Sequence, residues 1–387
     1  MQNFIYQSPT RIVFGKDQLQ QLPTMLKEAE VSSLLLVYGR ESIKRLGIYD
    51  RIKEITDELG IALCEESGVR PNPELKSVKS GRRKIIEHGV DFILAAGGGS
   101  VIDAAKAMAF AAFKPEEEIW RVYQRRLDIN RAIPLGVVLT LSATGSETNG
   151  NTVLSNDVLE EKRSIKHDAL VPRFAIIDPD YTRTVPTHHT IAGSVDILMH
   201  LFEQFFSPTP RTETGDYLLL GVMQSVLENT DRYLEGDNSY ETRANLSWAA
   251  TLALNWILQQ GRQGDWASHK LVYPPSAKYD LTHGFSLSAM QPVWMRMALE
   301  ANPGAMGPRL KQLGRRLFGV HTPEATIEAI VERFDAWGAP VKLSDLGVTL
   351  SEAECERFAS QVTDTGGLGH MFRLGFNEAL EFYRRQE

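Results

Sequence analysis

The chain has 387 residues, and its 42 basic and 49 acidic side chains leave a formal net charge of −7. A hydrophobic fraction of 43% and a charged fraction of 24% are ordinary for a folded globular protein and exclude a disordered or collagen-like chain. The acidic balance argues against a nucleic-acid partner, because no basic excess is present to neutralise phosphates.

The two cysteines, Cys64 and Cys355, are far apart and lack the spacing of a metal site. Reduced thiols are typical of a cytosolic protein, so we expect a cytoplasmic location. The opening residues, MQNFIYQSPTRIVFG, lack the charged start and apolar stretch of a signal peptide. The sequence contains no run of about 18 apolar residues, so no membrane span is predicted.

Up to residue 185, short apolar runs alternate with longer amphipathic stretches. Near-continuous apolarity is typical of strands that are covered on both faces, as in a parallel sheet. Strands are predicted at 34–38, 92–96, 133–140 and 174–177, and helices at 42–59 and 74–88. Polar turns around residues 149–163 predict a hairpin beside the main sheet. The alternation indicates an α/β architecture.

After Pro186 the strand signal nearly vanishes and long helical patterns follow. Helices are predicted at 187–206, 214–233, 239–260, 285–301 and 322–337. We therefore expect two domains, an α/β domain in residues 1–185 and a helical domain in residues 186–387. The boundary is expected within Asp178–Pro186.

Residues 96–106 read AGGGSVIDAAK and follow an apolar strand directly. Glycine lets a phosphate approach the main chain, and Ser100 is expected to cap the following helix. Free N–H groups and the positive end of the helix dipole then form an anion site. A tight structural turn is the alternative interpretation, since the segment is not the GxGxxG fingerprint.

A second turn, Tyr38–Ser42, follows the predicted strand at 34–38. Gly39 stands where an acidic residue would bind a ribose diol, and Arg40, Ser42 and Lys44 lie close by. This chemistry favours a 2′-phosphate, and hence NADP over NAD. A solvated basic turn is the alternative.

Four residues of the helical half could bind one metal ion. Asp196 and His200 have the i, i+4 spacing that places both side chains on one helix face, and His269 and His283 follow. Three imidazoles and one carboxylate suit a divalent metal such as Fe²⁺ or Zn²⁺. The alternative is that these histidines are structural.

Together, the segments GGGSVIDAAKAMA, TLSATGSETN, AGSVDILMHLFEQFF and DWASHK resemble the iron-containing alcohol dehydrogenase family. The resemblance covers nearly the whole chain and is closest to the NADP-dependent butanol dehydrogenase and aldehyde reductase branch. It implies a dinucleotide-binding α/β domain with a Rossmann-like parallel sheet and an all-α C-terminal domain. This is a dehydroquinate synthase-like architecture, with the active site between the domains and a homodimeric assembly.

The resemblance also assigns residues. The metal ligands would be Asp196, His200, His269 and His283. The pyrophosphate loop would be Gly97, Gly98, Gly99 and Ser100, with Asp103 in the same motif. The 2′-phosphate turn would comprise Gly39, Arg40 and Ser42. The nicotinamide half would be lined by Thr140, Thr144, Asn149 and Lys162, with Tyr181 near it and Asn72 on the cofactor side.

One departure from the family pattern matters for the chemistry. Tyr273 stands where the family usually has a second histidine, one turn after His269. A tyrosine hydroxyl can relay a proton, but its ordinary pKa of about 10 suits it poorly near neutral pH. The following prolines of YPPSAKYD are expected to exclude regular helix.

These features predict a metal-dependent, NADP(H)-linked dehydrogenase that interconverts short- to medium-chain alcohols and aldehydes. The metal would polarise the substrate oxygen while hydride passes between carbon and nicotinamide. Two alternatives stay open at this point. One is a metal-dependent lyase or cyclase that uses nicotinamide transiently, and the other is a catalytically weakened nucleotide-binding homologue.

Overall fold

A computed structural model describes residues 1–386, which form two compact units. We call them the sheet unit, residues 7–185 and 238–255, and the helical unit, residues 1–6, 186–237 and 256–386. Both units are discontinuous in sequence, since the first six residues belong to the helical unit and the segment 238–255 to the sheet unit.

The sheet unit is built on a six-stranded sheet in the order β1-β8-β5-β4-β2-β3, and every neighbouring pair is parallel. The strands are β1 Arg11–Phe14, β2 Ser33–Tyr38, β3 Ala62–Glu66, β4 Phe92–Gly97, β5 Leu135–Leu139 and β8 Phe174–Ile177. The predicted parallel α/β sheet is confirmed. The pairs Tyr38↔Ala96, Gly97↔Leu139 and Leu139↔Ile177 align the carboxyl ends of four strands at one edge.

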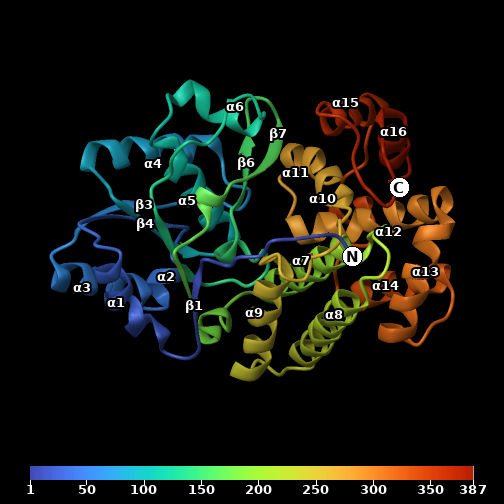
Figure 1. Ribbon diagram of the computed structural model, residues 1–387, viewed down its shortest axis with the longest axis horizontal. Helices are drawn as coiled ribbons and strands as arrows, with labels where there is room; N and C mark the ends of the chain where they lie inside the picture. The colour runs from blue at the N-terminus through green and yellow to red at the C-terminus, as the bar shows by residue number, and fades with distance from the viewer. Residues whose placement is uncertain (387) are drawn as a thin grey trace. The chain divides into compact units, whose positions relative to one another are not determined.

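Helices cover both faces of this sheet (Figure 1). Helices α1 Leu22–Glu28 and α3 Ile48–Leu59 pack on one face, and α4 Leu75–His88, α5 Gly99–Ala111 and α6 Ile119–Tyr123 pack on the other. Along β2, Leu34 and Leu36 belong to the apolar core on the face of α1 and α3, whereas Leu35 and Val37 belong to the core on the face of α4, α5 and α6. This two-sided burial explains why the central strands are apolar at every position.

The edge strands β1 and β3 were not predicted from the sequence. Both are only partly buried, so neither has the unbroken apolar run of a central strand. The predicted helix at 42–59 is two helices, α2 Ser42–Arg45 and α3, because Gly47 between them adopts φ 71°. The predicted hairpin is confirmed as β6 Asn151–Asn156 paired antiparallel with β7 Glu161–Lys166.

The helical unit contains no β-strand within the described residues, which confirms the predicted all-α region. Its main helices are α7 Thr187–Phe205, α8 Glu213–Leu234, α10 Ala267–Leu271, α11 Tyr273–Tyr279, α12 His283–Ala301, α13 Pro303–Leu313, α14 Pro323–Ala336, α15 Glu352–Thr363 and α16 Phe376–Arg384. The helix predicted at 239–260 is α9 Tyr240–Leu254, which belongs to the sheet unit and ends shortly before Trp256 adopts φ 71°.

The expectation that two prolines exclude helix after Tyr273 is wrong. Pro274 and Pro275 lie in the first turn of α11. The N–H groups of a first turn have no partner inside the helix, so proline removes no hydrogen bond there.

Among the residues that the structure describes, none of the helices combines the length and apolar character that a membrane crossing requires.

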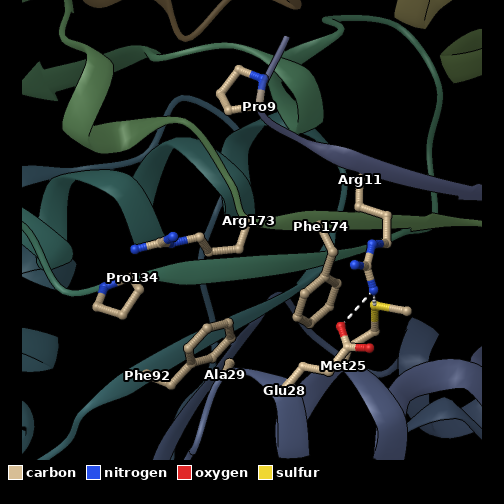
Figure 2. A pocket seen from close by; sticks show the side chains of 9 residues that line it. All are labelled: Pro9, Arg11, Met25, Glu28, Ala29, Phe92, Pro134, Arg173 and Phe174. Atoms are coloured by element: carbon tan, nitrogen blue, oxygen red, sulfur yellow. Dashed lines mark hydrogen bonds and ion pairs between the residues drawn. The ribbon is translucent and has the colours of Figure 1, made fainter.

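A pocket of about 410 Å³ opens at the amino-terminal edge of the sheet (Figure 2). It is lined by Arg11, Phe92 and Phe174, where β1, β4 and β8 begin, and by Arg173 beside them. Ligands of parallel α/β sheets bind at the opposite edge, beyond the carboxyl ends of the strands. This pocket is therefore separate from the predicted phosphate loop.

A buried lysine joins α5 to the chain that leads into the hairpin. Lys106 Nζ donates hydrogen bonds to the Ser146 carbonyl at 2.6 Å, to Ser146 Oγ at 2.8 Å and to the Asn151 carbonyl at 2.8 Å. Ser146 Oγ in turn donates to Asp103 Oδ1 at 2.8 Å. Burial lowers the pKa of Lys106 to about 8, although the charges of Asp103 and Glu147 oppose that shift.

This network predicts that Lys106→Met lowers the free energy of unfolding by about 2–4 kcal/mol at pH 7, because buried acceptors lose their donor. Denaturant unfolding measures the change. The exposed Lys76→Met is the matched control, expected within about 0.5 kcal/mol of the wild type. Between pH 8 and 10.5 the unfolded chain binds more protons at Lys106 than the folded one, so the wild type gains stability relative to Lys106→Met as the pH rises. A constant difference across this range contradicts the prediction.

Candidate functional site

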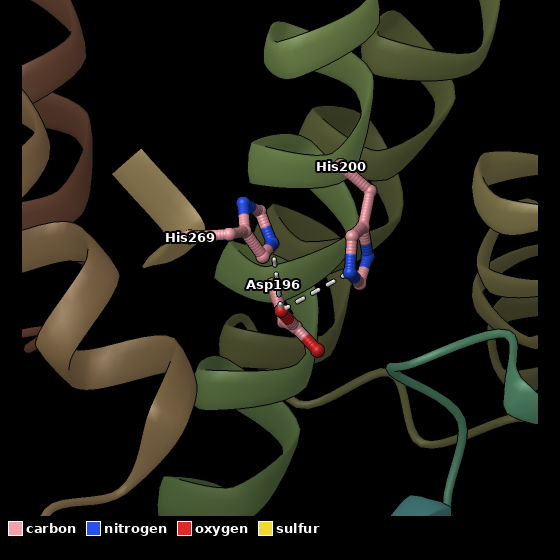
Figure 3. A group of neighbouring side chains, drawn as sticks. All are labelled: Asp196, His200 and His269. Carbon is pink, nitrogen blue, oxygen red and sulfur yellow. Dashed lines mark ion pairs between the residues drawn. The ribbon is translucent and has the colours of Figure 1, made fainter. Parts of the chain in front are cut away.

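One face of α7 carries the centre of the candidate metal site. The helix begins at Thr187, and the i, i+4 spacing of Asp196 and His200 projects both side chains to the same side. Both side chains are buried. Figure 3 shows them turned toward each other, with His269 of α10 approaching from a second segment. These three residues offer ligand atoms that all lie within 4.8 Å of one another.

His283 completes the predicted group. It is the first residue of α12, and Gly284 lets that helix lie directly on α7, because a Cβ at Gly284 would come within 2.0 Å of the Ala192 carbonyl oxygen. Ala192 lies one turn before Asp196 on α7. The close contact therefore explains how the start of α12 reaches the carboxylate.

The distances fit a shared ion. Asp196 Oδ1 lies 3.7 Å from His200 Nε2, 3.9 Å from His269 Nε2 and 3.7 Å from His283 Nε2. These separations are too long for hydrogen bonds. Metal–ligand bonds of about 2.0–2.2 Å in a tetrahedral arrangement place ligand atoms roughly 3.4 Å apart, which is close to the observed spacing.

Two of these buried atoms also need a partner. Within residues 1–386, Asp196 Oδ1 and His269 Nε2 make no hydrogen bond. Buried polar atoms are nearly always satisfied, and a carboxylate oxygen beside three imidazole nitrogens is the donor set of Fe²⁺ or Zn²⁺. The residues therefore fit the predicted metal.

The pKa shifts of the cluster differ from one residue to the next. Burial opposes ionisation of Asp196, yet the neighbouring His200, His269 and His283 hold its pKa well below the usual range. Burial lowers the pKa of His200 to about 4, which leaves this imidazole neutral at pH 7. Burial also acts against charge on His269, but its contacts with Asp196 and Glu203 raise its pKa to about 9.

Glu203 is a site residue that the sequence analysis missed. Its carboxylate is buried and accepts hydrogen bonds from His269 Nδ1 at 2.9 Å, the His269 N–H at 3.0 Å, Ser268 Oγ at 2.6 Å and the Trp266 N–H at 2.6 Å. The available signal was spacing, since Glu203 lies seven residues after Asp196 and three after His200 on one helix face.

The predicted phosphate loop joins β4 to α5. Gly98 is the N-cap of α5, so the expectation that Ser100 caps this helix is wrong, and Ser100 lies one residue inside it. A Cβ at Gly97 would approach Val101 Cγ2 to 2.6 Å, and a Cβ at Gly99 would approach Thr144 Oγ1 to 2.5 Å. The glycines therefore serve close packing as well as access to the helix N-terminus.

Further cofactor candidates lie along the same sheet edge. The Thr140 N–H donates to the Gly97 carbonyl at 3.1 Å, so Thr140 and Thr144 both lie beside the loop. Tyr181 lies in the short helix Pro179–Thr182 that follows β8. Lys162 of β7 donates to Asn72 Oδ1 at 2.7 Å, which brings these two predicted residues into contact.

Asp103 and Asn149 are placed differently. Asn149 Nδ2 donates to the carbonyls of Gly145 at 2.8 Å and Leu254 at 3.1 Å, and Asn149 Oδ1 accepts from the Asn151 N–H at 2.8 Å. Asp103 accepts from Ser146 Oγ and the Val153 N–H. Both residues are bound into the interior network around Lys106, and their contact with cofactor stays a prediction.

The turn after β2 is open to solvent. Gly39 follows the last residue of that strand, and Arg40, Ser42 and Lys44 are exposed. On the neighbouring strand β3, the Glu65 carboxylate accepts hydrogen bonds from the Tyr38 hydroxyl at 2.7 Å and from the Tyr49 hydroxyl at 2.8 Å. No acidic side chain occupies the position of Gly39 itself.

Tyr273 lies beside the metal cluster. Its ring centroid is 6.1 Å from that of His283, and it begins α11 directly after the helix that carries His269. The position is compatible with a proton relay, which stays a prediction.

Comparison with known proteins agrees with this arrangement. Residues 9–179 match the family model "Iron-containing alcohol dehydrogenase", and residues 190–378 match "Fe-containing alcohol dehydrogenase family, C-terminal". The chain is 39% identical over 99% of its length to a probable NADH-dependent butanol dehydrogenase 2 of Bacillus subtilis, of which 99% is covered. It is 32% identical to the NADPH-dependent aldehyde reductase YqhD of Escherichia coli, over 90% of each chain.

A solved structure shows the same fold. The crystal structure of NADH-dependent butanol dehydrogenase A from Thermotoga maritima superposes with a TM-score of 0.93 at 33% identity, covering 100% of this chain and 99% of the other. The sequence matches over both halves, the shared fold and the Asp–His cluster lead to one conclusion: this chain belongs to the iron-containing alcohol dehydrogenase family of oxidoreductases.

Proposed function

We propose that the protein is a metal-dependent, NADP(H)-linked alcohol dehydrogenase and aldehyde reductase for short- to medium-chain substrates. The observation that carries the proposal is the approach of three imidazole Nε2 atoms to one buried carboxylate oxygen, at 3.7–3.9 Å. Family membership and the names of the relatives, which are butanol dehydrogenases and an aldehyde reductase, support the substrate class.

The four residues Asp196, His200, His269 and His283 would hold one Fe²⁺ or Zn²⁺ ion. When bound, such an ion supplies a Lewis acid that polarises an alcohol or aldehyde oxygen, and a nicotinamide supplies or accepts the hydride. The negative charge of Asp196 offsets part of the ion's charge and so moderates its acidity. We assign Tyr273, beside His283, as a candidate to pass the substrate proton to solvent.

The carboxyl edge of the sheet would bind the dinucleotide. The first N–H groups of a helix have no partner inside it, and in α5 they belong to Gly99 and Ser100, from which a pyrophosphate would accept. Thr140 and Thr144 flank this loop, and the hydrogen bond between Lys162 and Asn72 supports a shared role of these two residues on the cofactor side. Accordingly we propose residues 1–185 as the cofactor domain and residues 186–387 as the metal domain.

The turn at Gly39 supports NADP(H) over NAD(H). A carboxylate after β2 would bind a ribose diol and repel a 2′-phosphate, and none is present at Gly39. Exposed Arg40, Ser42 and Lys44 can instead bind a phosphate. The relatives' names include both NADH-dependent and NADPH-dependent enzymes, so the preference rests on the turn.

We also propose that the protein forms a homodimer. Light scattering, which gives the molar mass in solution, tests this proposal.

Metal analysis of the purified protein, combined with an NADPH-oxidation screen over linear aldehydes, tests the proposed function directly. We expect about one Fe²⁺ or Zn²⁺ per chain and NADPH consumption that depends on both aldehyde and metal. Tight NADPH binding without turnover on any aldehyde would favour a weakened homologue. Product formation without net NADPH consumption would favour a lyase.

His269→Ala is expected to abolish aldehyde reduction and to lower Zn²⁺ affinity by more than about 100-fold, because it removes a ligand from a four-ligand site. Affinity is measured by competition with a chelator. His321→Ala removes an exposed histidine of the helical unit and serves as the control. Unchanged metal content and full activity in His269→Ala would contradict the ligand assignment.

Gly39→Asp is expected to lower kcat/KM for NADPH at least about tenfold and to shift the preference toward NADH, because the new carboxylate repels a 2′-phosphate. The position accepts a side chain, since a Cβ would lie 3.4 Å from the nearest atom, the Val69 carbonyl oxygen. Gly39→Asn adds the same bulk without charge and separates repulsion from crowding. A wild type that already prefers NADH would reject this interpretation of the turn.

A further inference from the structure

Glu203 joins the segment that presents His269 to α7, while the side chains of Asp265 and Trp266 anchor the same segment to other parts of the helical unit. Residues 264–269 connect to α7 through Glu203, whose backbone carbonyl accepts from the Asp265 N–H at 2.8 Å and whose carboxylate accepts the four hydrogen bonds described above. The Glu203 side chain is 1% exposed, so these contacts form away from solvent. No basic side chain within the described residues forms an ion pair with this carboxylate other than His269.

The two oxygens of the Glu203 carboxylate accept hydrogen bonds from different residues. Oε2 accepts from the Trp266 N–H at 2.6 Å, at a residue that adopts the left-handed conformation with φ 61°. A tryptophan rarely adopts this conformation, so the turn depends on its surroundings to persist. Oε1 accepts from the His269 ring and backbone, and Ser268 Oγ orients the same oxygen.

The contact with the ring also decides which nitrogen carries the proton. A carboxylate only accepts hydrogen bonds, so His269 Nδ1 is the donor at 2.9 Å. In the neutral ring Nε2 then has its lone pair exposed, and Nε2 is the atom that faces Asp196 Oδ1. Glu203 lies on the opposite side of the ring from Nε2 and cannot take that coordination position itself.

We propose that Glu203 is a positioning residue of the metal centre, which fixes both the orientation and the tautomer of His269 so that Nε2 is offered to the ion. The inference rests on the proposed function, because it assumes that the Asp–His cluster binds a divalent metal. It adds to that function a residue of α7 that sets metal affinity without being a ligand.

Glu203→Gln is the informative change, because it keeps the shape of the side chain and replaces one of its two acceptor oxygens by an NH₂ donor. Whichever way the amide turns, its NH₂ group faces a hydrogen-bond donor. This donor is either the Trp266 N–H, or the group of donors formed by Ser268 and His269. If the NH₂ group faces His269, the ring is driven to carry its proton on Nε2, which blocks coordination. We expect Co²⁺ affinity of the metal-free protein to fall about 10- to 100-fold, with a changed ligand-field absorption spectrum of the Co²⁺-loaded form.

Ser268→Ala is the matched control. It removes one hydrogen bond to the same oxygen but leaves the contact between Glu203 and the imidazole, so Co²⁺ affinity should stay within about threefold of wild type and the spectrum should be unchanged. A merely structural role predicts the reverse pattern, in which both variants lose stability and neither loses affinity. Co²⁺ affinity and spectrum in Glu203→Gln that equal those of wild type overturn the inference while the proposed function stands. A wild type that binds no Co²⁺ overturns both.

A measurement on the wild type covers the case in which Glu203→Gln does not fold. In Zn²⁺-loaded protein labelled with ¹⁵N-histidine, the His269 ring, identified by the signals lost in His269→Ala, should carry its proton on Nδ1. A proton on Nε2 of this ring overturns the inference.

Discussion

The candidate metal centre is built around one buried negative charge. Asp196 lies inside α7 with its carboxylate among three histidines, and isolated burial of such a charge would cost several kcal/mol. The neighbouring imidazoles hold its pKa far below the ordinary range, so the group stays ionised. Burial lowers the pKa of His200 beside it, so this imidazole stays neutral and keeps a lone pair available, whereas the contacts of His269 with Asp196 and Glu203 raise the pKa of that ring. A divalent cation at the common centre would satisfy all of these atoms at once, which favours a binding site over a packing arrangement.

A single helix face distributes these roles. Asp196 and His200 point to the centre, whereas Glu203 one turn later points to the chain that brings His269. The remaining histidine arrives through backbone contact, because Gly284 allows α12 to lie against α7 at Ala192. Trp266, left-handed at the start of the short helix α10, donates its N–H to the Glu203 carboxylate and so ties that helix to α7. The candidate metal centre is thus organised around one helix.

Prediction from the sequence succeeded where residue type and residue spacing indicate the same structure. The central strands were recognisable because both faces are buried, and the candidate ligands because aspartate and histidine share a helix face and a chemistry. The edge strands β1 and β3 were missed because half-buried strands resemble amphipathic loops. Glu203 was missed because an acidic residue late in a helix is ordinarily solvated, and only the fold shows that it is enclosed. The prolines after Tyr273 were misjudged because their effect depends on whether they begin a helix or interrupt one.

The glycine-rich loop shows a further limit of motif reading. Residue types that identify a phosphate loop are explained in part by packing alone, since Gly97 and Gly99 leave no room for a Cβ against Val101 and Thr144. The Asp103 and Lys106 side chains of the same motif face inward and join α5 to the hairpin. The residues of this motif therefore determine how the loop packs on the protein interior, as well as which ligand the loop would bind. Because the N-terminus of α5 is anchored on its inner side, its N–H groups are already oriented before any anion arrives, which reduces the entropy that binding must overcome.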